Sequence, residues 1–454
     1  MDRVSDGESP PAAGSRAAPE TSAAFHRRRG AAVDYAGGNG SLWSECSART
    51  WAGPIRPSSQ PAIPDHLLTE IFLRLPDPAD LVRASAACVP FRQLATEGSF
   101  LRRFRRLHAP PFLAFLDHGR FHPALPPHPS APAARELAIA ADFSFSFLPS
   151  HCRWAVRDIR GGLVLLDREL EKDEEPTNFT ELVVCDPLHR RYLVIPPVPD
   201  DLAPSMEYTF PRQPGLSYVP FLLPLGDEAT AATEEQASFR VIWLAYYKPM
   251  VTAFIFSSHT GQWRAWRDLA FGDLEHFMAP RIPPSCMRRH HAYGVFYWDL
   301  LTITSKKMLV LDTNRMEFSV IDLPPGEWSR EGLAIVEAGE GRLGMFGFHG
   351  EVASHLSYTI AQNKGATPRQ WQTEKTIALD SGYKYYIKAA TERYLLLVRT
   401  QRSSVANNPL YEYLSMDIKT FQLHSVCVKQ YQPTLLGTHI YTNFPPSLLS
   451  SPAI

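Results

Sequence analysis

Six consecutive residues match the spacing of a dinucleotide-binding loop, Gly339-Glu340-Gly341-Arg342-Leu343-Gly344. In such a loop the glycines let the backbone approach a pyrophosphate, which lies at the N-terminus of the helix that follows. The next residues here are Met345-Phe346-Gly347-Phe348-His349-Gly350, which are β-like and rich in Gly, so no helix is expected to follow the loop. We therefore interpret the segment as a hairpin turn and not as a nucleotide site.

Metal and hydrolase chemistry have little support in the sequence. His290-His291 has no Cys or carboxylate at ligand spacing, and no G-x-S-x-G nucleophile elbow occurs. The cysteines are far apart and form no C-x-x-C pair, which disfavours a zinc site or a disulfide framework and fits a reducing compartment. They are Cys46, Cys88, Cys152, Cys185, Cys286 and Cys427. We expect no catalytic residues, no metal and no cofactor.

Two further groups of side chains could bind a partner. The arginines between Arg102 and Arg106 could contact phosphates, but we interpret them as the solvated face of a helix. Several aromatic residues could form a binding cage, but we expect most of them to be core, with any outward-facing ones available as interface anchors. They are Trp243, Tyr246, Tyr247, Trp263, Trp266, Tyr297, Trp298 and Trp371.

Composition narrows the class of protein. The 46 Lys and Arg nearly cancel the 47 Asp and Glu, so the chain lacks the basic excess typical of nucleic-acid binding. The most apolar stretch, Val241–Phe256, is interrupted by Lys248-Pro249, so we expect no membrane span. Residues 1–40 contain no apolar signal-peptide region. These patterns predict a cytoplasmic or nuclear protein.

The amino-terminal part has two different compositions. Residues 1–58 are rich in Ala, Gly, Ser, Pro and Arg, and we expect them to be a disordered low-complexity tail. From Ile63 to Leu75 the apolar positions Leu68, Ile71 and Leu75 follow helical spacing, with Pro64 in the first turn and Pro76 ending the helix.

Three more short helices are expected. Asp77 is placed to cap a second helix that has Pro78 at its first position and Asp80 three residues after the cap. Val89-Pro90 breaks that helix, and a third begins around Phe91. A fourth covers Ser99–His108, with apolar residues on one side and the arginines on the other.

Ile63–Ala95 resembles the F-box. The family's opening pattern appears as Ile63-Pro64-Asp65-His66-Leu67-Leu68, its Asp-Leu pair as Asp80-Leu81, and its late Cys-x-x-aromatic-Arg as Cys88-Val89-Pro90-Phe91-Arg92. The family usually has Trp where Phe91 stands and a basic residue in place of Pro90. The following helix and Pro110-Pro111-Phe112-Leu113 look like the linker of large plant F-box families, especially those of grasses, in which a β-propeller-like associated domain follows.

The resemblance implies a non-catalytic receptor that works by proximity. It implies that residues 59–108, the F-box and linker helix, dock a Skp-family adaptor and through it a cullin–RING ligase. The rest of the chain would then hold an unknown protein substrate for ubiquitination, as in an SCF-type (Skp–cullin–F-box) E3 ligase. The residues that we expect to bind the adaptor are Ile63, Pro64, Leu67, Leu68, Ile71, Leu75, Pro76, Leu81 and Phe91.

Residues 109–454 are predicted to form a large all-β domain. Short apolar runs separated by Gly, Pro, Asn or Asp recur along it. Four strand–turn–strand units, which begin near Val183, Phe254, Leu309 and Leu414, form a weak repeat whose shorter spacings suit propeller blades. We therefore predict an irregular β-propeller, with residues 199–237 as a loop insert. A pair of β-sandwiches is the alternative fold.

Two other functions stay open from the sequence. The protein could be a non-degradative binding scaffold built on a β-propeller, because Pro90 and Phe91 depart from the F-box pattern. It could also be an enzyme built in the propeller, which would need acids or metal ligands to converge on the central channel.

Overall fold

The computed structural model describes most of residues 63–448. The gaps lie at 77, 150–152, 170–173, 175–178, 203–217, 224–238, 248–249, 271–286, 301–306, 351–354, 365–369, 403–408, 432 and 434–436. The expected tail 1–58 and the capping residue Asp77 lie outside the described residues. No helix in the described part is long and apolar enough to cross a bilayer.

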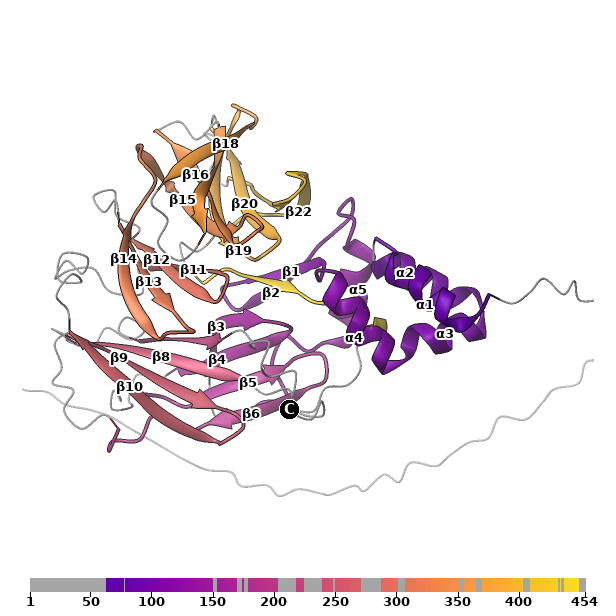
Figure 1. The fold of residues 1–454 in the computed structure, drawn as a ribbon, viewed down its shortest axis with the longest axis horizontal. Helices are drawn as coiled ribbons and strands as arrows, with labels where there is room; N and C mark the ends of the chain where they lie inside the picture. Colours follow the sequence, from indigo (N-terminus) through magenta and orange to yellow (C-terminus); the bar gives the residue numbers. More distant parts are fainter. Residues whose placement is uncertain are drawn as a thin grey trace, which may run out of the picture. The chain divides into compact units, whose positions relative to one another are not determined.

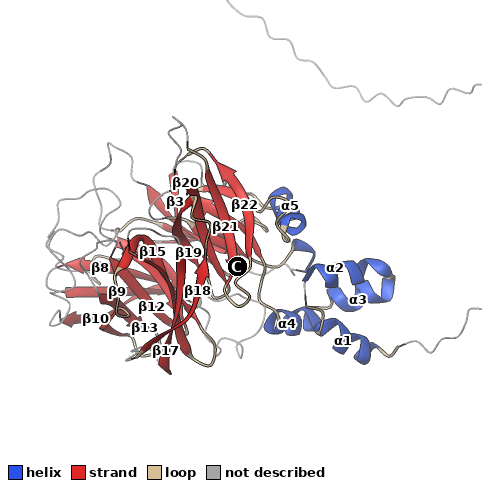
Figure 2. Cartoon of the chain, turned by 90° about the horizontal axis from the view of Figure 1, so that it is seen from above, coloured by secondary structure: helices blue, strands red, loops and turns tan. Residues whose placement is uncertain are grey.

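The chain begins its described part with four short helices (Figure 1), which gather together apart from the sheets (Figure 2). They are α1 (Asp65–Leu73), α2 (Pro78–Ala87), α3 (Val89–Thr96) and α4 (Gly98–Leu107). We call α1–α4 the helical module. The four helices agree with the sequence prediction, except that Pro90 does not lie between α2 and α3. It lies in the first turn of α3, where a missing N–H costs nothing because no intrahelical acceptor is available there.

Large apolar side chains form one core inside the helical module. Phe72 and Leu81 are 5% and 0% exposed, and Phe100 packs edge-on against Phe72 at 6.5 Å between ring centroids. Phe91, which stands where the family has Trp, packs edge-on against Phe72 at 5.1 Å. The smaller ring at position 91 is therefore part of the packed core.

Six antiparallel sheets follow the helical module in the described chain. The sheet that receives both ends of this region combines β1 (Phe112–Asp117), β2 (Arg120–Pro123) and β23 (His439–Thr442), in the order β2-β1-β23. We call it the closing blade. Helix α5 (Ala131–Ala140), which the sequence did not lead us to expect, connects it to the next sheet.

Each of the other five sheets has four strands that are consecutive in the sequence. They are β3 (Arg153–Arg160), β4 (Leu163–Glu169), β5 (Leu182–Asp186) and β6 (Arg191–Ile195); β7 (Tyr218–Leu223), β8 (Arg240–Tyr247), β9 (Met250–Ser257) and β10 (Gln262–Ala270); β11 (Met287–Ala292), β12 (Val295–Leu300), β13 (Lys307–Asp312) and β14 (Glu317–Asp322); β15 (Trp328–Glu337), β16 (Arg342–His349), β17 (His355–Lys364) and β18 (Trp371–Ala378); and β19 (Tyr383–Ala390), β20 (Tyr394–Gln401), β21 (Tyr411–Asp417) and β22 (Leu423–Lys429).

The sheets are arranged as the blades of a six-bladed β-propeller (Figure 1). The first strands of successive blades lie beside one another, with β3 next to β7, β11 next to β15, and β15 next to β19. Strand β23 lies between β19 and β3 and so closes the ring. The predicted propeller is confirmed, and its blade number, which the sequence left open, is six.

The four predicted strand–turn–strand units are the outer hairpins of four blades. They correspond to β5–β6, β9–β10, β13–β14 and β21–β22. The expected loop insert 199–237 contains strand β7, so this part of the segment is an inner strand of a blade.

Neighbouring blades are held together by apolar side chains. Phe221 of one blade and Phe296 of the next lie 4.6 Å apart between ring centroids, and Phe115 stacks on Tyr413 at 4.4 Å. Trp243 and Trp298 are 2% and 4% exposed, which agrees with the expectation that most aromatics are core.

Candidate functional site

The adaptor-binding residues predicted from the sequence divide between the surface and the core of the helical module. Ile63, Leu67 and Ile71 are 51%, 48% and 49% exposed. Pro64 and Pro76 are also exposed. Leu67 and Ile71 are four residues apart and therefore lie on one side of α1, and Ile63 lies two residues before the helix begins. We call Ile63, Leu67 and Ile71 the α1 ridge.

The remaining predicted residues support this surface from beneath. Leu68 and Leu81 are buried, while Leu75 and Phe91 are partly buried and pack against the same core. Helix α1 is therefore apolar on two sides. The side with Leu68 packs in the core of the described module, and the side with Leu67 and Ile71 is exposed. Sequence reasoning missed Val89, which is 68% exposed at the start of α3 and could have been found as an apolar residue beside a helix-initiating proline.

The arginines of α4 are mostly solvent-exposed, as expected, with one exception. Arg105 is partly buried, and its Nη2 donates a hydrogen bond to the backbone oxygen of Leu448 at 2.7 Å. Phe444, from the same segment as Leu448, also packs on α4: its ring centroid lies 6.3 Å from that of Phe104. The segment after β23 therefore completes the core of the helical module.

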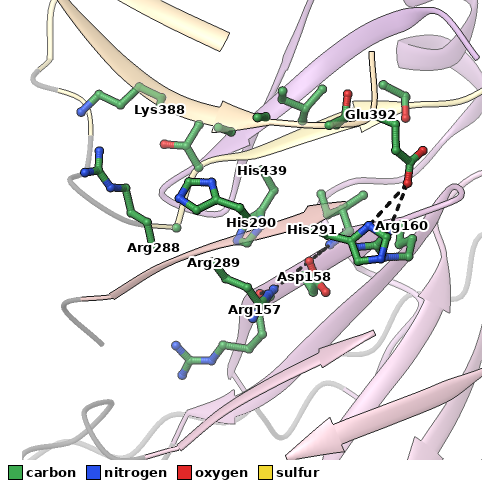
Figure 3. Close-up of a pocket in the computed structure, with 18 of the residues that line it drawn as sticks. Arg157, Asp158, Arg160, Arg288, Arg289, His290, His291, Lys388, Glu392 and His439 are labelled. Carbon is green, nitrogen blue, oxygen red and sulfur yellow. Dashed lines mark hydrogen bonds and ion pairs between the residues drawn. The ribbon is translucent and has the colours of Figure 1, made fainter. Parts of the chain in front are cut away.

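A second candidate site is a cavity of about 370 Å³ in the propeller channel, lined mainly by the inner strands β3, β11, β19 and β23. Figure 3 shows its charged side chains. The sequence analysis did not predict this site. The lining cations are Arg157, Arg160, Arg288, Arg289 and Lys388, and the lining carboxylates are Asp158 and Glu392.

Asp158 joins three blades at the wall of this cavity. Its Oδ1 lies 2.9 Å from Nη2 of Arg289 on β11, and its Oδ2 accepts a hydrogen bond from the backbone N–H of Leu222 on β7 at 2.9 Å. Burial alone would raise the pKa of this carboxyl, but Arg289 and Arg160 hold the pKa below its usual value. Asp158 is therefore an ionised, fully engaged carboxylate.

Arg288 is held from behind by a neighbouring strand. Its Nη2 donates to Oδ2 of Asp299 at 2.8 Å, and Nε2 of His290 lies 3.0 Å from the other carboxylate oxygen. The space for its guanidinium depends on Gly332, because a Cβ there would lie 2.3 Å from Nη1 of Arg288. Gly332 also has a φ of +120°, which L side chains rarely adopt.

The opposite side of the cavity is formed by Arg160, Glu392 and His291 (Figure 3). Nη1 of Arg160 lies 3.5 Å from Oε1 of Glu392 and 3.4 Å from Nδ1 of His291. Because the Glu392 side chain is 59% exposed, its ion pair is weak.

Burial changes the protonation of three basic groups around the channel. Desolvation lowers the pKa of His291 to about 3 and that of His439 to about 4, so both imidazoles are neutral at pH 7. Desolvation lowers the pKa of Lys388 to about 8; Asp117 opposes this shift and Arg288 adds to it. The cavity thus combines permanent arginine charges with a lysine that titrates slightly above neutral pH.

Comparison with known proteins identifies the helical module. A family model described as F-box-like matches residues 61–107. The chain therefore contains an F-box-like domain followed by a six-bladed β-propeller. A search of curated proteins found no match.

Solved structures with some similarity cover much of the chain at low identity. A nidogen/laminin complex is 11% identical, covers 72% of this chain and 97% of its own, and has a TM-score of 0.35. The β-propeller domain of the trilobed protease from Pyrococcus furiosus is 8% identical, covers 61% and 70%, and has a TM-score of 0.34. The α-L-arabinofuranosidase Arb93A from Fusarium graminearum is 11% identical, covers 66% and 92%, and has a TM-score of 0.33. Likeness at this level carries no argument about function.

Proposed function

We propose that this protein is the substrate-recognition subunit of an SCF-type E3 ubiquitin ligase. The observation that supports this most directly is an F-box-like domain with an uncovered apolar surface. F-box domains in general bind Skp-type adaptors, and F-box proteins are typically non-catalytic members of the ligase. The propeller would hold the target protein, and the adaptor would connect it to a cullin–RING scaffold.

The α1 ridge is the proposed centre of the adaptor contact. Leu67 lies about half exposed on the side of α1 opposite the core residue Phe72. Removing such apolar side chains from water on binding stabilises a complex by roughly 1.5–3 kcal/mol for each fully buried residue. Ile63 and Ile71 extend the ridge, and Pro64 and Pro76 flank it. Leu68, Leu75, Leu81 and Phe91 are proposed to act by shaping the module under this surface.

Charged substitutions on the ridge test the adaptor contact. Leu67→Asp and Ile71→Asp should each weaken binding of a Skp-family adaptor to the full-length protein by roughly 10- to 150-fold, because each removes the burial of one apolar side chain. Isothermal titration calorimetry measures the affinity. Ile139→Asp is the matched control, since Ile139 is 76% exposed on α5, outside the module, and should bind normally. Wild-type affinity in both ridge variants would reject the proposed surface.

The ligase role needs a second experiment, because a scaffold could also bind the adaptor. Substrates would first be identified by proximity labelling with and without proteasome inhibition. Ubiquitination would then be reconstituted with the adaptor, cullin and RING subunits. Transfer to the substrate that depends on Leu67 supports the receptor function, whereas adaptor binding without transfer favours a non-degradative scaffold.

We further propose that the propeller corresponds to the associated domain of the plant F-box families that the sequence resembles. The protein would act in the cytoplasm or the nucleus, where SCF-type ligases operate.

A further inference from the structure

The channel cavity has the size and the charge of a ligand site. Its volume of about 370 Å³ lies within the range of roughly 300–1,000 Å³ that is typical of small-molecule pockets. Its described lining residues include five cationic side chains, and four of them pair with carboxylates: Arg157 with Asp167, Arg160 with Glu392, Arg288 with Asp299 and Arg289 with Asp158. Because His291 and His439 are neutral at pH 7, they add no charge. Paired guanidinium groups can still donate their remaining N–H groups to an anion.

The carboxylates near the cavity are already engaged. Asp158 is held by Arg289 and a backbone N–H, and Asp299 holds Arg288 and His290 from the neighbouring strand. This arrangement resembles the outer partners that orient ligand-binding groups in other sites. The acids therefore fix the positions of Arg288 and Arg289 at the wall of the cavity.

Three buried nitrogen atoms of lining residues make no hydrogen bond within the described chain. They are Nε of Arg160, Nε of Arg288 and Nε2 of His291. The two arginine nitrogens can only donate. Nδ1 of neutral His291 lies 3.4 Å from Nη1 of Arg160, which only donates, and 3.7 Å from Oε1 of Glu392, which is beyond hydrogen-bond distance, so the imidazole proton belongs on Nε2.

All three unpaired atoms are therefore donors. A buried donor without an acceptor costs roughly 1–3 kcal/mol, so an acceptor atom placed beside any of the three would stabilise the site. Phosphate and carboxylate oxygens are the acceptors that guanidinium groups prefer.

We propose that the channel cavity binds a small polyanion, with two or more negative charges carried by phosphate or carboxylate groups. Arg160 and Arg288 contact it from opposite sides, Lys388 supplies a further charge, and His291 donates one hydrogen bond. The cavity is too small to surround a folded partner, and the chain as a whole lacks a basic excess, which separates this ligand from a nucleic acid. The proposal does not depend on the adaptor contact.

Titration of the full-length protein with two probes tests the site. Pyrophosphate and citrate, each at matched ionic strength against sodium chloride, are titrated by calorimetry at pH 7. At least one should bind with 1:1 stoichiometry, and comparison of the two distinguishes phosphate from carboxylate chemistry. If neither binds, or if only an acidic peptide or a phosphopeptide does, the proposal is wrong.

Two substitutions that change the charge of the cavity in opposite directions make the test specific. Lys388→Gln should weaken the probe at least about tenfold, and Glu392→Gln should tighten it, because the first removes a positive charge and the second a negative charge at the cavity. Lys384→Gln is the matched control on the same strand, since Lys384 pairs with Glu331 and does not line the cavity. A merely structural role for these residues would not give opposite effects, so equal or absent effects of the first two variants would overturn the site.

The pH dependence gives an independent measurement. The charged groups that affect Lys388 are Asp117 on β1 and Arg288 on β11. Because Lys388 loses its proton near pH 8, the affinity ratio of wild type to Lys388→Gln should shrink between pH 7 and pH 9. Both proteins bind the same probe, so ionisation of the probe cancels in this ratio. A ratio that stays constant between pH 7 and pH 9 would contradict the proposed contact of charged Lys388 with the anion.

Discussion

At the scale of single residues, Asp158 is a carboxylate that connects three blades of the propeller. It is 7% exposed and bonds to Arg289 and to the N–H of Leu222, each from a different blade. Apolar contacts between blades are non-directional, whereas this carboxylate holds β3, β7 and β11 at defined distances.

Removal of this carboxylate should destabilise the propeller. Breaking a buried ion pair on one side costs roughly 3–5 kcal/mol, because the remaining charge stays buried, so Asp158→Ala should lower the free energy of unfolding by about that amount. Urea unfolding followed by tryptophan fluorescence measures the change.

A surface aspartate provides the control. The Asp322 side chain is 81% exposed and 3.8 Å from Lys307, so Asp322→Ala should cost less than about 1 kcal/mol. Equal losses in the two variants would show that Asp158 does not join the blades.

Acidification should weaken the fold through its histidines. Desolvation lowers the pKa of His122, His128 and His439 to about 4 and that of His291 to about 3, whereas the unfolded value is near 6.5. Below pH 6.5 the unfolded chain therefore binds more protons, and stability falls as the pH decreases. Each histidine contributes a slope of up to about 1.4 kcal/mol per pH unit.

Urea midpoints at pH 7 and pH 5 measure this effect. The midpoint should be lower at pH 5, and His291→Gln should reduce the difference between the two values. A midpoint that is unchanged or higher at pH 5 would argue against neutral buried histidines.

At the scale of elements, the sequence predicted the outer parts of the blades better than the inner strands. Leu309–Leu311 and Tyr394–Val398 are apolar runs because both faces of a middle strand pack on neighbouring blades. The inner strand β11 reads Met287-Arg-Arg-His-His-Ala292, and β3 carries Arg157, Asp158 and Arg160. Their polar side chains line the channel, so an apolar pattern could not reveal them.

The same reason explains why the channel site was missed. Its residues come from strands more than 100 positions apart, and nothing in the local sequence says that Arg160 and Arg288 share a cavity. The helical module was easier to predict, because caps, prolines and apolar spacing are local signals. Pro90 was predicted to break a helix because α3 was expected to begin around Phe91. The helix begins instead at Val89, so Pro90 lies in its first turn.

The segment after β23 follows the last strand of the propeller and packs against the helical module through Phe444 and Leu448. Phe444 is 5% exposed and belongs to the same cluster as Phe72 and Leu81. Phe444→Ala should cost roughly 3–5 kcal/mol within that cluster, because it leaves a cavity beside Phe104.

Hydrogen exchange locates this loss. Amides of α1 and α4 should exchange faster in Phe444→Ala, while those of β8 stay protected. Leu410→Ala is the control, because Leu410 is 55% exposed and does not belong to the core of the helical module. Unchanged protection of α4 would mean that the segment contributes nothing to the module.

At the scale of the whole molecule, the closing blade connects the propeller to the helical module twice. One connection is the chain between α4 and β1, and the other is the chain after β23. β1 leaves the linker after α4, and β23 pairs with β1 and then leads into the 3-10 helix η3 (Pro446–Leu448). The proposed adaptor surface and the proposed anion site are therefore built on domains that meet through the closing blade.

This closure has a consequence for the order of biosynthesis. Strand β23 begins at residue 439 and β1 at residue 112, so the ribosome adds 327 residues between them. At roughly 5–20 residues per second, β1 waits on the order of tens of seconds for its partner. During that time the ring is open and the helical module lacks Phe444. A nascent chain thus acquires a complete channel and a complete adaptor-docking module together, and a truncated translation product acquires neither.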